Sequence, residues 1–378
     1  MEYPMIWLSS PHPSGKEQKY IDDAFSHRRL FAFGENIDGF EQDIEGYLGQ
    51  DVHVAALNSG TSAIHMALIL LGVTRNEEVL CQSLTFAASA NPVVYLGATP
   101  VFIDSEPDTW NICPNALEEA IKSRLAKGKK PKAIIAVHLY GMPYKADEIR
   151  QIANKYDIAV VEDSAEALGS SYKGQKCGTL GDISILSFNG NKIVTTASGG
   201  ALVSSSREIK QKAIFLSSQA KDPAPYYQHS HIGYNYRMSN INAGIGRGQM
   251  EVLQQYINLR RNNNLFYQNL FKDTGYISVL TSPNDDYYSN YWLTVITLNH
   301  TIKSGESLRL YLASKNIEAR PLWKPLHLQP VFKDCAYYGG SVAEDLFNTG
   351  LCLPSGSNLT EAEKERIAEG FATWNCML

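Results

Sequence analysis

One lysine stands out by its surroundings. The stretch "ILSFNGNKIVTTASGGALV" (residues 185–203) begins and ends like a strand, and Lys192 lies between the two ends. A lysine held in a partly desolvated pocket becomes a nucleophilic amine that forms a Schiff base with a carbonyl. Ser187 adds a hydroxyl, and Gly199 and Gly200 allow backbone to pass close to a ligand. Taken alone, the same pattern fits a surface lysine in a loop, which is the commoner fate of lysines.

Three acidic residues follow another strand-like stretch. In "VVEDSAEALG" (160–169), Glu162, Asp163 and Glu166 crowd the end of a very apolar run. A carboxylate at this point suits a cationic partner, such as a protonated ring nitrogen. Acidic residues in the first turn of a helix would give the same pattern, because they complement the helix dipole.

A third stretch, "NSGTSA" (58–63), suits an anion. Gly60 and Thr61 begin a helical pattern, so free backbone N–H groups and the helix dipole would face a phosphate. A plain helix cap explains the stretch equally well. It is neither a P-loop nor a G-x-G-x-x-G motif, which favours a mononucleotide-sized cofactor over a dinucleotide.

The three stretches together meet the needs of one cofactor, pyridoxal 5′-phosphate (PLP). Its phosphate needs N–H and hydroxyl donors, its ring nitrogen needs a carboxylate, and its aldehyde needs a lysine amine. The helix start, the acidic residues and the lysine occur in that order along the chain. The sequence therefore predicts a PLP site.

The elements that must position these residues form an alternating pattern from residue 52 to about 204. Runs such as "KAIIAV" (132–137) and "IAVV" (158–161) are apolar at consecutive positions, which is typical of parallel strands buried on both faces. Helical patterns separate them, including one near Phe86–Leu96. This alternation predicts an α/β domain with a mainly parallel sheet, whose ligands bind beyond the carboxyl ends of the strands.

The alternation of strand and helix patterns does not continue in the second half of the chain. Residues 218–238 are rich in Tyr, His and Pro and have no clear period, which predicts a long functional or interface loop. A single long helix is expected over 239–271. Strands near 292–298 and 319–321, with helices near 304–315, 341–349 and 360–374, predict a smaller α/β domain. We expect a large PLP-binding domain over 1–250 and a small one over 251–378.

Composition limits the class of protein. The 378 residues include 34 basic and 39 acidic side chains, a net charge of −5, which argues against a polyanion-binding surface over the whole molecule. The six cysteines show no metal-ligand spacing, so we expect free thiols and no metal site. No signal peptide or membrane-spanning run is apparent, and the expected location is the cytoplasm.

Long stretches of the chain resemble the DegT/DnrJ/EryC1/StrS family of PLP-dependent nucleotide-sugar aminotransferases. Among them are "NSGTSAIHMAL", "VHLYGMP", "VEDSAEALGSSYKGQKCGTLGDISILSFNGNKIVTTASGGALV" and "GYNYRMSNINAGIGRGQ". The resemblance extends over nearly the whole chain. It implies fold type I, the aspartate aminotransferase-like fold. It also implies homodimers with active sites at the subunit interface.

The resemblance also implies roles for the cofactor-binding residues. Lys192 matches the lysine that bonds to the cofactor and moves a proton, and Asp163 matches the partner of the pyridine nitrogen. Phe86 matches the aromatic residue that stacks on the ring. The phosphate cradle is expected from Gly60, Thr61 and Ser187, with Asn235 reaching it from the neighbouring subunit.

Other positions are less settled by the resemblance. Glu166 stands where many relatives have Gln or His near the cofactor's phenolic oxygen, and it could bind sugar or stay protonated. Glu162 and His327, the latter in "KPLHLQPVF", are expected at the substrate. The segment Ser26–Asn36, "SHRRLFAFGEN", departs from the pattern of close relatives, and that segment lies near the substrate in the family.

The expected activity is transamination of a nucleotide-linked 4-keto-6-deoxy sugar with L-glutamate as donor. "SFNGNKI" (187–193) resembles the C4-aminating enzymes, and the nearest match is the bacillosamine type, whose substrate is UDP-2-acetamido-4-keto-2,4,6-trideoxyhexose. A GDP- or dTDP-keto-sugar or a cyclitol ketone is an alternative. A PLP-fold sugar dehydratase is disfavoured because such relatives replace the lysine with histidine. A non-catalytic nucleotide-binding module is disfavoured by Lys192 and its partners.

Overall fold

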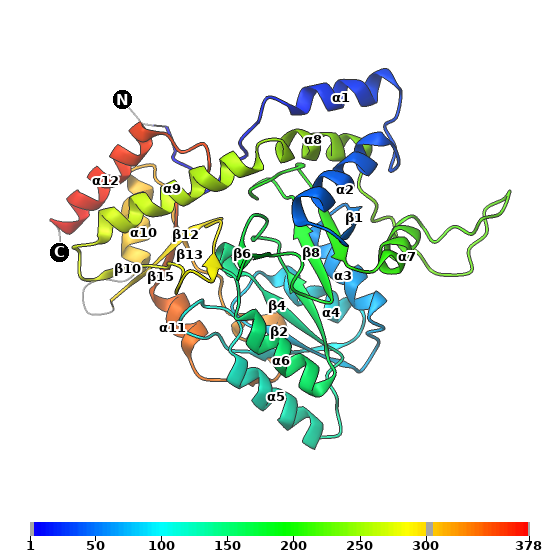
Figure 1. The fold of residues 1–378 in the computed structure, drawn as a ribbon. Helices are drawn as coiled ribbons and strands as arrows, with labels where there is room; N and C mark the ends of the chain where they lie inside the picture. The colour runs from blue at the N-terminus through cyan, green and yellow to red at the C-terminus, as the bar shows by residue number, and fades with distance from the viewer. Residues whose placement is uncertain (1–3, 300–304, 377–378) are drawn as a thin grey trace.

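A large twisted sheet lies at the centre of the computed structural model, which describes residues 4–299 and 305–376 (Figure 1). In these residues the sheet has eight strands in the order β1-β9-β8-β5-β4-β2-β3-β14. Only β9 runs antiparallel to its neighbours, so the expected mainly parallel sheet is confirmed. The strands are β1 His53–Leu57, β9 Gly200–Ser204, β8 Ile183–Ser187, β5 Ala159–Asp163, β4 Ala133–Val137, β2 Glu78–Gln82, β3 Thr99–Ile103 and β14 Tyr337–Tyr338.

Both faces of this sheet are covered by apolar side chains. In β4 all five residues are buried, and they alternate between two cores: Ile134 and Ala136 face one, Ala133, Ile135 and Val137 the other. Successive side chains of a strand point to opposite faces, so a strand covered on both sides must be apolar throughout. This explains the continuous apolar run in the sequence.

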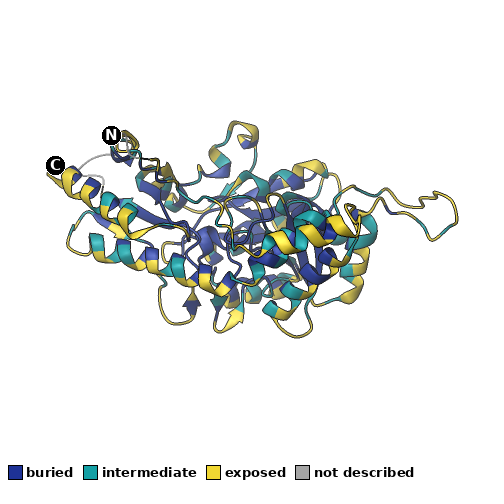
Figure 2. Ribbon diagram, turned by 90° about the horizontal axis from the view of Figure 1, so that it is seen from above, coloured by how far each residue is buried: buried dark blue, intermediate teal, exposed yellow. Residues whose placement is uncertain are grey.

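Helices form the outer layers of the molecule, and Figure 2 shows buried residues concentrated between them. The helices α3, α4 and α7 pack on one face of the sheet, and α5 and α6 pack on the other. Their bounds are α3 Gly60–Leu70, α4 Asn91–Tyr95, α5 Pro114–Ala126, α6 Ala146–Tyr156 and α7 Arg207–Ser217. The expected fold type I architecture is therefore confirmed.

Several elements differ from the sequence prediction. The helix expected over 239–271 is two helices, α8 (Asn240–Met250) and α9 (Leu253–Phe271), separated at Val252 by a non-helical φ of −118°. The helix expected near Phe86–Leu96 is a 3₁₀ turn, Ala87–Ser89, followed by the short α4. Three helices were not anticipated: α7, and also α1 (Glu17–Ser26) and α2 (Glu35–Leu48), which both lie against α8.

Glycines let α1 and α2 approach α8 closely. A side chain at Gly248 would lie 2.6 Å from the backbone of Glu17, and one at Gly246 would lie 2.6 Å from the ring of Phe40. The glycine-rich sequence of α8 is thus a packing face. Helix formation there depends on tertiary contacts, because glycine disfavours an isolated helix.

The C-terminal part of the chain forms a smaller sheet in the order β10-β12-β15-β13. Its strands are β10 Ile277–Val279, β12 Thr294–Leu298, β15 Gly350–Leu353 and β13 Arg320–Pro321. The helices around it are α10 Gly305–Ser314, α11 Val342–Thr349 and α12 Glu361–Asn375. These match the expected elements, except that residue 304 of the first helix lies outside the described residues.

The two halves of the chain exchange segments. Ile6 bridges to Ile317 beside the small sheet, while β14 adds to the edge of the large one. A third sheet joins β6 (Ser171–Tyr172) and β7 (Gln175–Lys176) to β11 (Tyr287–Tyr288). The division into domains at residues 250 and 251 stays a prediction.

Among the described residues, none of the helices has both the length and the apolar character needed to cross a membrane.

Candidate active site

A cavity of about 450 Å³ opens at the carboxyl ends of the central strands. Val137, Asp163 and Ser187 are the last residues of β4, β5 and β8, and all three line it. This is the place where parallel α/β sheets bind their ligands. Its lining also includes Ser59, Gly60, Thr61, Phe86, Ser89, Glu166, Asn191, Lys192, Gly199, Trp292, Arg320 and Trp323.

Lys192 points into this cavity between an acid and an aromatic ring. Its Nζ lies 3.4 Å from Oε1 of Glu166 and 4.0 Å from the ring centroid of Trp292. Its side chain is only 13% exposed. A lysine in this position is not a solvated surface lysine, so the commoner interpretation of the stretch is excluded by the structure.

Asp163 is a buried carboxylate at the end of β5. Its Oδ2 accepts a hydrogen bond from the hydroxyl of Ser89 at 2.7 Å, and its Oδ1 accepts one from the backbone N–H of Ala165 at 3.2 Å. Burial raises the pKa of Asp163, although the Ser89 hydroxyl acts in the opposite direction. A cation placed against this carboxylate would favour its charged form.

Glu166 completes the charged group. Its Oε2 accepts a hydrogen bond from the backbone N–H of Tyr140 at 2.7 Å. Burial raises the pKa of Glu166, and the positive charge of Lys192 opposes this shift. Tyr140 has a φ of 53°, a left-handed conformation that costs a bulky residue roughly 1 kcal/mol or more. The strained backbone at Tyr140 directs an N–H group at Glu166, as strain at functional sites often does.

The start of α3 forms one wall of the cavity. Ser59 caps the helix by accepting the N–H of Ser62, which leaves the first helical residues, Gly60 and Thr61, at the cavity. Ser187 stands beside them, since a side chain at Gly60 would lie 3.0 Å from its Cβ. Gly200 has its own close contact, because an added Cβ would lie 2.3 Å from the backbone of Ser59. Gly200 therefore lets β9 lie directly against the helix start.

Aromatic side chains surround the cavity mouth. Phe86 is 54% exposed, and its ring lies 5.2 Å from that of Trp323. Arg320 lies at the rim, where its guanidinium donates a hydrogen bond to Glu318 at 2.7 Å. Exposed aromatic faces beside a cation suit a ligand that combines a flat ring or a sugar face with negative charge.

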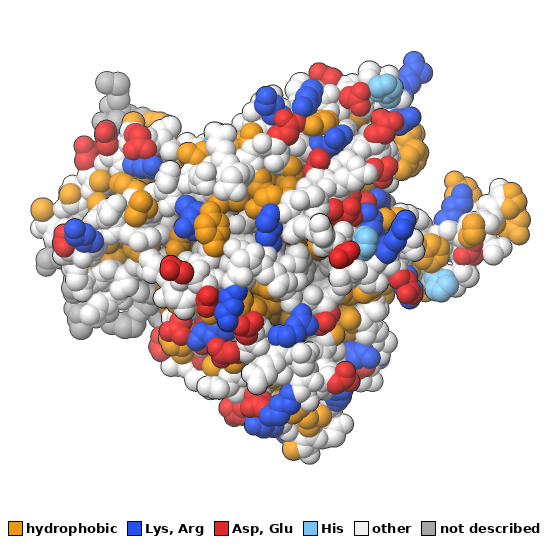
Figure 3. Space-filling model, viewed as in Figure 1, with side chains coloured by type: hydrophobic (Ala, Val, Ile, Leu, Met, Phe, Trp, Pro, Cys, Tyr) orange, Lys and Arg blue, Asp and Glu red, His pale blue; other side chains and the backbone are white. Residues whose placement is uncertain are grey.

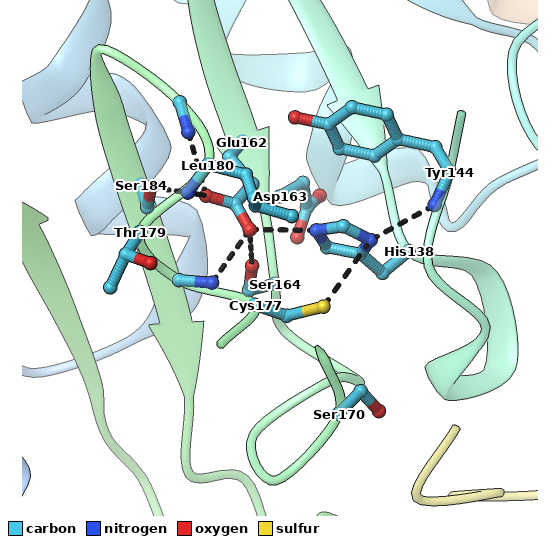
Figure 4. Close-up of polar contacts among 12 residues, drawn as sticks. His138, Tyr144, Glu162, Asp163, Ser164, Ser170, Cys177, Thr179, Leu180 and Ser184 are labelled. Atoms are coloured by element: carbon cyan, nitrogen blue, oxygen red, sulfur yellow. Dashed lines mark hydrogen bonds and ion pairs between the residues drawn. The ribbon is translucent and has the colours of Figure 1, made fainter. Parts of the chain in front are cut away.

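Glu162 does not line the cavity, which corrects the expectation that it contacts the substrate. Its carboxylate is fully buried at the centre of the group in Figure 4. It accepts hydrogen bonds from His138 Nε2, two serine hydroxyls and three backbone N–H groups. The backbone donors belong to Gly178, Leu180 and Gly181. Glu162 therefore fixes the loop between β7 and β8. Burial alone would raise the pKa of Glu162, but the contact with His138 and the other hydrogen bonds lower it to about 2.

His138, Glu162 and Cys177 are the one group of metal-type ligands that lie close together in the described part of the chain. Their donor atoms already have partners: His138 Nδ1 accepts the N–H of Tyr144 at 3.2 Å while Nε2 donates to Glu162 at 2.7 Å. A neutral imidazole satisfies both contacts. Burial raises the pKa of the Cys177 thiol, which disfavours a metal-binding thiolate.

His327 also lies outside the cavity lining, contrary to expectation. Its Nδ1 is 2.7 Å from the Ser83 hydroxyl, its Nε2 is 3.2 Å from Glu344, and its ring stacks on Tyr337 at 3.8 Å. The imidazole thus joins the segment before β14 to the end of β2. It has no free nitrogen to offer a substrate within this chain.

Asn235 and the divergent segment Ser26–Asn36 lie outside the lining of this chain's cavity too. The carbonyl of Asn235 accepts a hydrogen bond from Asn58 at 3.1 Å, beside the start of α3. Phe31 and Phe33 stack at 4.9 Å and are both largely exposed. The role of Asn235 in a neighbouring subunit stays a prediction.

Comparison with known proteins decides the family. The model of the DegT/DnrJ/EryC1/StrS aminotransferase family matches residues 12–372. The chain belongs to this family. It is therefore a PLP-dependent sugar aminotransferase, as the resemblance implied.

Relatives of this aminotransferase align over most of its length. EpsN of Bacillus subtilis, named as a pyridoxal phosphate-dependent aminotransferase, is 49% identical over 96% of this chain and 94% of its own. GDP-perosamine synthase of Escherichia coli O157:H7 is 36% identical over 97% of both chains. A Campylobacter jejuni UDP-4-amino-4,6-dideoxy-N-acetyl-beta-L-altrosamine transaminase is 36% identical over 65% of both chains.

Solved structures agree with the fold of this aminotransferase. The sugar aminotransferase Spr1654 from Streptococcus pneumoniae, in its PMP form, has a TM-score of 0.90 and 26% identity. The match covers 100% of this chain and 98% of Spr1654. Helicobacter pylori PseC, an aminotransferase of pseudoaminic acid biosynthesis, has a TM-score of 0.89 and 25% identity, with coverage of 99% and 100%.

The residues of the cavity fit PLP. The helix start with Thr61 and Ser187 provides N–H and hydroxyl donors for a phosphate. The buried carboxylate of Asp163 suits a protonated ring nitrogen, the ring of Phe86 is free to stack, and Lys192 provides the amine. Bound here, PLP would supply a reactive aldehyde and an electron-withdrawing ring.

Sequence reasoning missed several residues of this site. Ser89, Tyr140, Trp292 and Trp323 come from a 3₁₀ turn, a strained turn and the C-terminal part of the chain. Tyr140 lies within "VHLYGMP", one of the stretches that carry the family resemblance, but none of the four residues was expected at the site. Trp292 lies 101 positions after Asn191, and only its place at the start of a predicted strand could have drawn attention to it.

We expect Glu162→Gln to lower the stability of the protein at neutral pH. The folded-state pKa of Glu162 is about 2, below the ordinary 4.5, so its contribution is present above about pH 4.5 and is lost as the pH falls toward 2. The pKa difference corresponds to roughly 3 kcal/mol. Urea unfolding at pH 7, 4.5 and 3 should show a large loss at pH 7 and a smaller one at pH 3.

Glu118→Gln is the matched control for this experiment. Ion pairing with Lys155 lowers the pKa of Glu118 to about 2 as well, but this carboxylate is on the surface, where solvent screens it. Its loss should leave the unfolding midpoint nearly unchanged. Equal effects of the two substitutions would contradict the assignment of Glu162 as a buried anchor.

Asp163→Asn should reduce turnover roughly 100-fold or more while PLP still binds, because an amide cannot hold a proton on the ring nitrogen as a carboxylate does. The phosphate donors at Gly60, Thr61 and Ser187 are untouched. Turnover and PLP content, measured by absorbance, separate the two effects. Ser89→Ala, which keeps the carboxylate, is the control. Near-normal turnover in Asp163→Asn would place the electron-sink role elsewhere.

Proposed function

We propose that this aminotransferase moves the amine of L-glutamate to C4 of a nucleotide-linked 4-keto-6-deoxy sugar. The proposed substrate is UDP-2-acetamido-4-keto-2,4,6-trideoxyhexose, used in the synthesis of a bacterial glycan or surface polysaccharide. In the net reaction glutamate becomes 2-oxoglutarate, the ketone becomes an amine, and no external oxidant is needed. The observation that carries the chemistry is the buried group of Lys192, Glu166 and Asp163 in one cavity.

Each member of this group has a task in the proposed reaction. The Nζ amine of Lys192 accepts a proton from one reacting carbon and delivers it to another. Glu166, 3.4 Å from that atom, stabilises the ammonium while the proton is held. Asp163 keeps a proton on the ring nitrogen of the cofactor. The walls of the cavity leave these groups little contact with water, which strengthens their interactions.

The mouth of the cavity supports a sugar linked to a diphosphate. Phe86 and Trp323 present aromatic surface, and Arg320 provides a cation whose side chain is 68% exposed. A diphosphate is common to UDP- and GDP-linked sugars, so this arrangement favours neither nucleotide. For the carbon, support comes from "SFNGNKI" and from the altrosamine transaminase, whose name places the amine at C4.

A GDP-linked 4-keto-sugar is the second candidate. The GDP-perosamine synthases align over 97% of this chain, whereas the UDP-sugar transaminase aligns over 65%. The longer alignment includes the C-terminal part, which supplies Trp292, Arg320 and Trp323 to the cavity. This observation favours GDP and makes the nucleotide the first property to test.

We also propose a homodimer with shared active sites. Residues 219–234, called the arm here, project from the body of the molecule (Figure 1), and Tyr226, Tyr227 and Ile232 on it are 64%, 84% and 86% exposed. Figure 3 shows hydrophobic side chains gathered at its tip. Such exposed apolar surface is typical of interaction sites. The cytoplasm remains the proposed location, since the six cysteines are unpaired in the structure.

The nucleotide and the carbon are tested with a panel of sugars, each supplied with L-glutamate. The panel holds UDP-2-acetamido-4-keto-2,4,6-trideoxyhexose, a GDP-4-keto-6-deoxyhexose and a dTDP-3-keto-6-deoxyhexose, and NMR locates the new amine. We expect the UDP-sugar to be aminated at C4 with the highest kcat/KM, and Lys192→Ala to form no product. Preference for the GDP-sugar would support the second candidate, and amination of the 3-keto sugar alone would refute the choice of carbon.

Shared sites are tested by mixing two inactive variants, Lys192→Ala and Asn235→Ala. If Asn235 acts in the neighbouring subunit, a mixed dimer has one site with both residues intact. Random exchange should then restore up to about a quarter of the wild-type activity. Each variant incubated alone is the control. No recovery in subunits shown to exchange would contradict the arrangement.

A further inference from the structure

Trp292 lines the cavity beside Lys192. The Nζ of Lys192 lies 4.0 Å from the centroid of its ring, and the Trp292 side chain is 1% exposed. A cation over the face of tryptophan is attracted by the negative charge of the ring, most strongly when water is excluded. The free amine of Lys192 therefore has two stabilising neighbours, a carboxylate and an aromatic face.

The same side chain also holds the backbone before the lysine. The indole Nε1–H of Trp292 donates to the carbonyl of Asn191 at 2.8 Å, and the hydroxyl of Ser9 donates to that carbonyl at 2.9 Å. Asn191 directly precedes Lys192. Trp292 thus contacts both the backbone just before Lys192 and the amine of Lys192.

Trp292 is itself held from several directions. The backbone N–H of Trp292 donates to Oδ1 of Asn290 at 2.8 Å, and Nδ2 of Asn290 donates to the backbone carbonyl of Glu166 at 3.0 Å. The guanidinium of Arg260, which is 1% exposed, donates to the carbonyl of Trp292 and to the hydroxyl of Ser9. These bonds couple the position of the ring to Glu166 and to the N-terminal segment.

We propose that Trp292 is a positioning residue for Lys192. Its ring holds the ammonium whenever the amine is not bonded to the cofactor, and its N–H fixes the preceding carbonyl so that the amine stays aimed at the reacting carbon. A tryptophan that only filled the core would have no reason to present its face to Nζ and its N–H to Asn191. The inference rests on the transamination chemistry of the family and not on the choice of sugar or donor.

The test measures the reactivity of the free amine. The full chain is loaded with pyridoxamine phosphate, which leaves Lys192 unbonded, so neither sugar nor glutamate is needed. Acetylation of Lys192 by acetic anhydride is followed by mass spectrometry from pH 6 to pH 10. In Trp292→Leu we expect roughly tenfold faster labelling at neutral pH, because the ammonium loses a stabilising neighbour. Unchanged labelling in a folded Trp292→Leu protein would overturn the proposal.

A second series separates this role from packing. Tryptophan analogues with one to three ring fluorines are placed at position 292 alone, which weakens the negative face while keeping the shape and the N–H group. Labelling should rise stepwise with fluorination, and a flat series would overturn the proposal even if Trp292→Leu does not fold. Trp374→Leu, which removes a buried tryptophan from the core of the small sheet, is the control and should leave labelling unchanged.

Discussion

A cation and two carboxylates, Lys192, Glu166 and Asp163, share a cavity largely closed to water, and the protein must replace the hydration that they lost. Taking charges out of water costs several kcal/mol per ion unless partners compensate. The compensation is visible for each group: an N–H from Tyr140 for Glu166, a hydroxyl from Ser89 for Asp163, and the ring of Trp292 for Lys192. Much of the local structure follows from this need.

The partners come from distant parts of the chain. Tyr140 follows β4 in a strained left-handed conformation, Ser89 lies in a 3₁₀ turn after β2, and Trp292 precedes β12. Ser9 and Arg260 then support Trp292 and the carbonyl before Lys192. The N-terminal segment and α9 are therefore part of the site's support, as is the buried anchor at Glu162, one residue before Asp163 (Figure 4).

Two surface segments expose aromatic side chains to water. The arm exposes aromatic side chains, and the divergent segment Ser26–Asn36 exposes Phe31 and Phe33 away from the cavity of its own chain. Apolar surface of this kind loses free energy in water and gains it at an interface. In the proposed dimer, such surface would be buried between the subunits.

The sequence by itself determined the sheet, most of its helices, the family, and the positions of Lys192, Asp163, Gly60, Thr61 and Ser187 around one cavity. These follow from local patterns: apolar runs specify buried parallel strands, and chemistry-bearing residues follow the strand ends.

Only the tertiary structure decided which acids face the cavity. Glu162 and Asp163 are adjacent, but successive strand residues point to opposite faces, so one became an anchor and the other a site residue. It also decided the break between α8 and α9, the contacts of His327, and the place of Trp292, because these depend on contacts between segments a hundred or more positions apart, which no local pattern encodes.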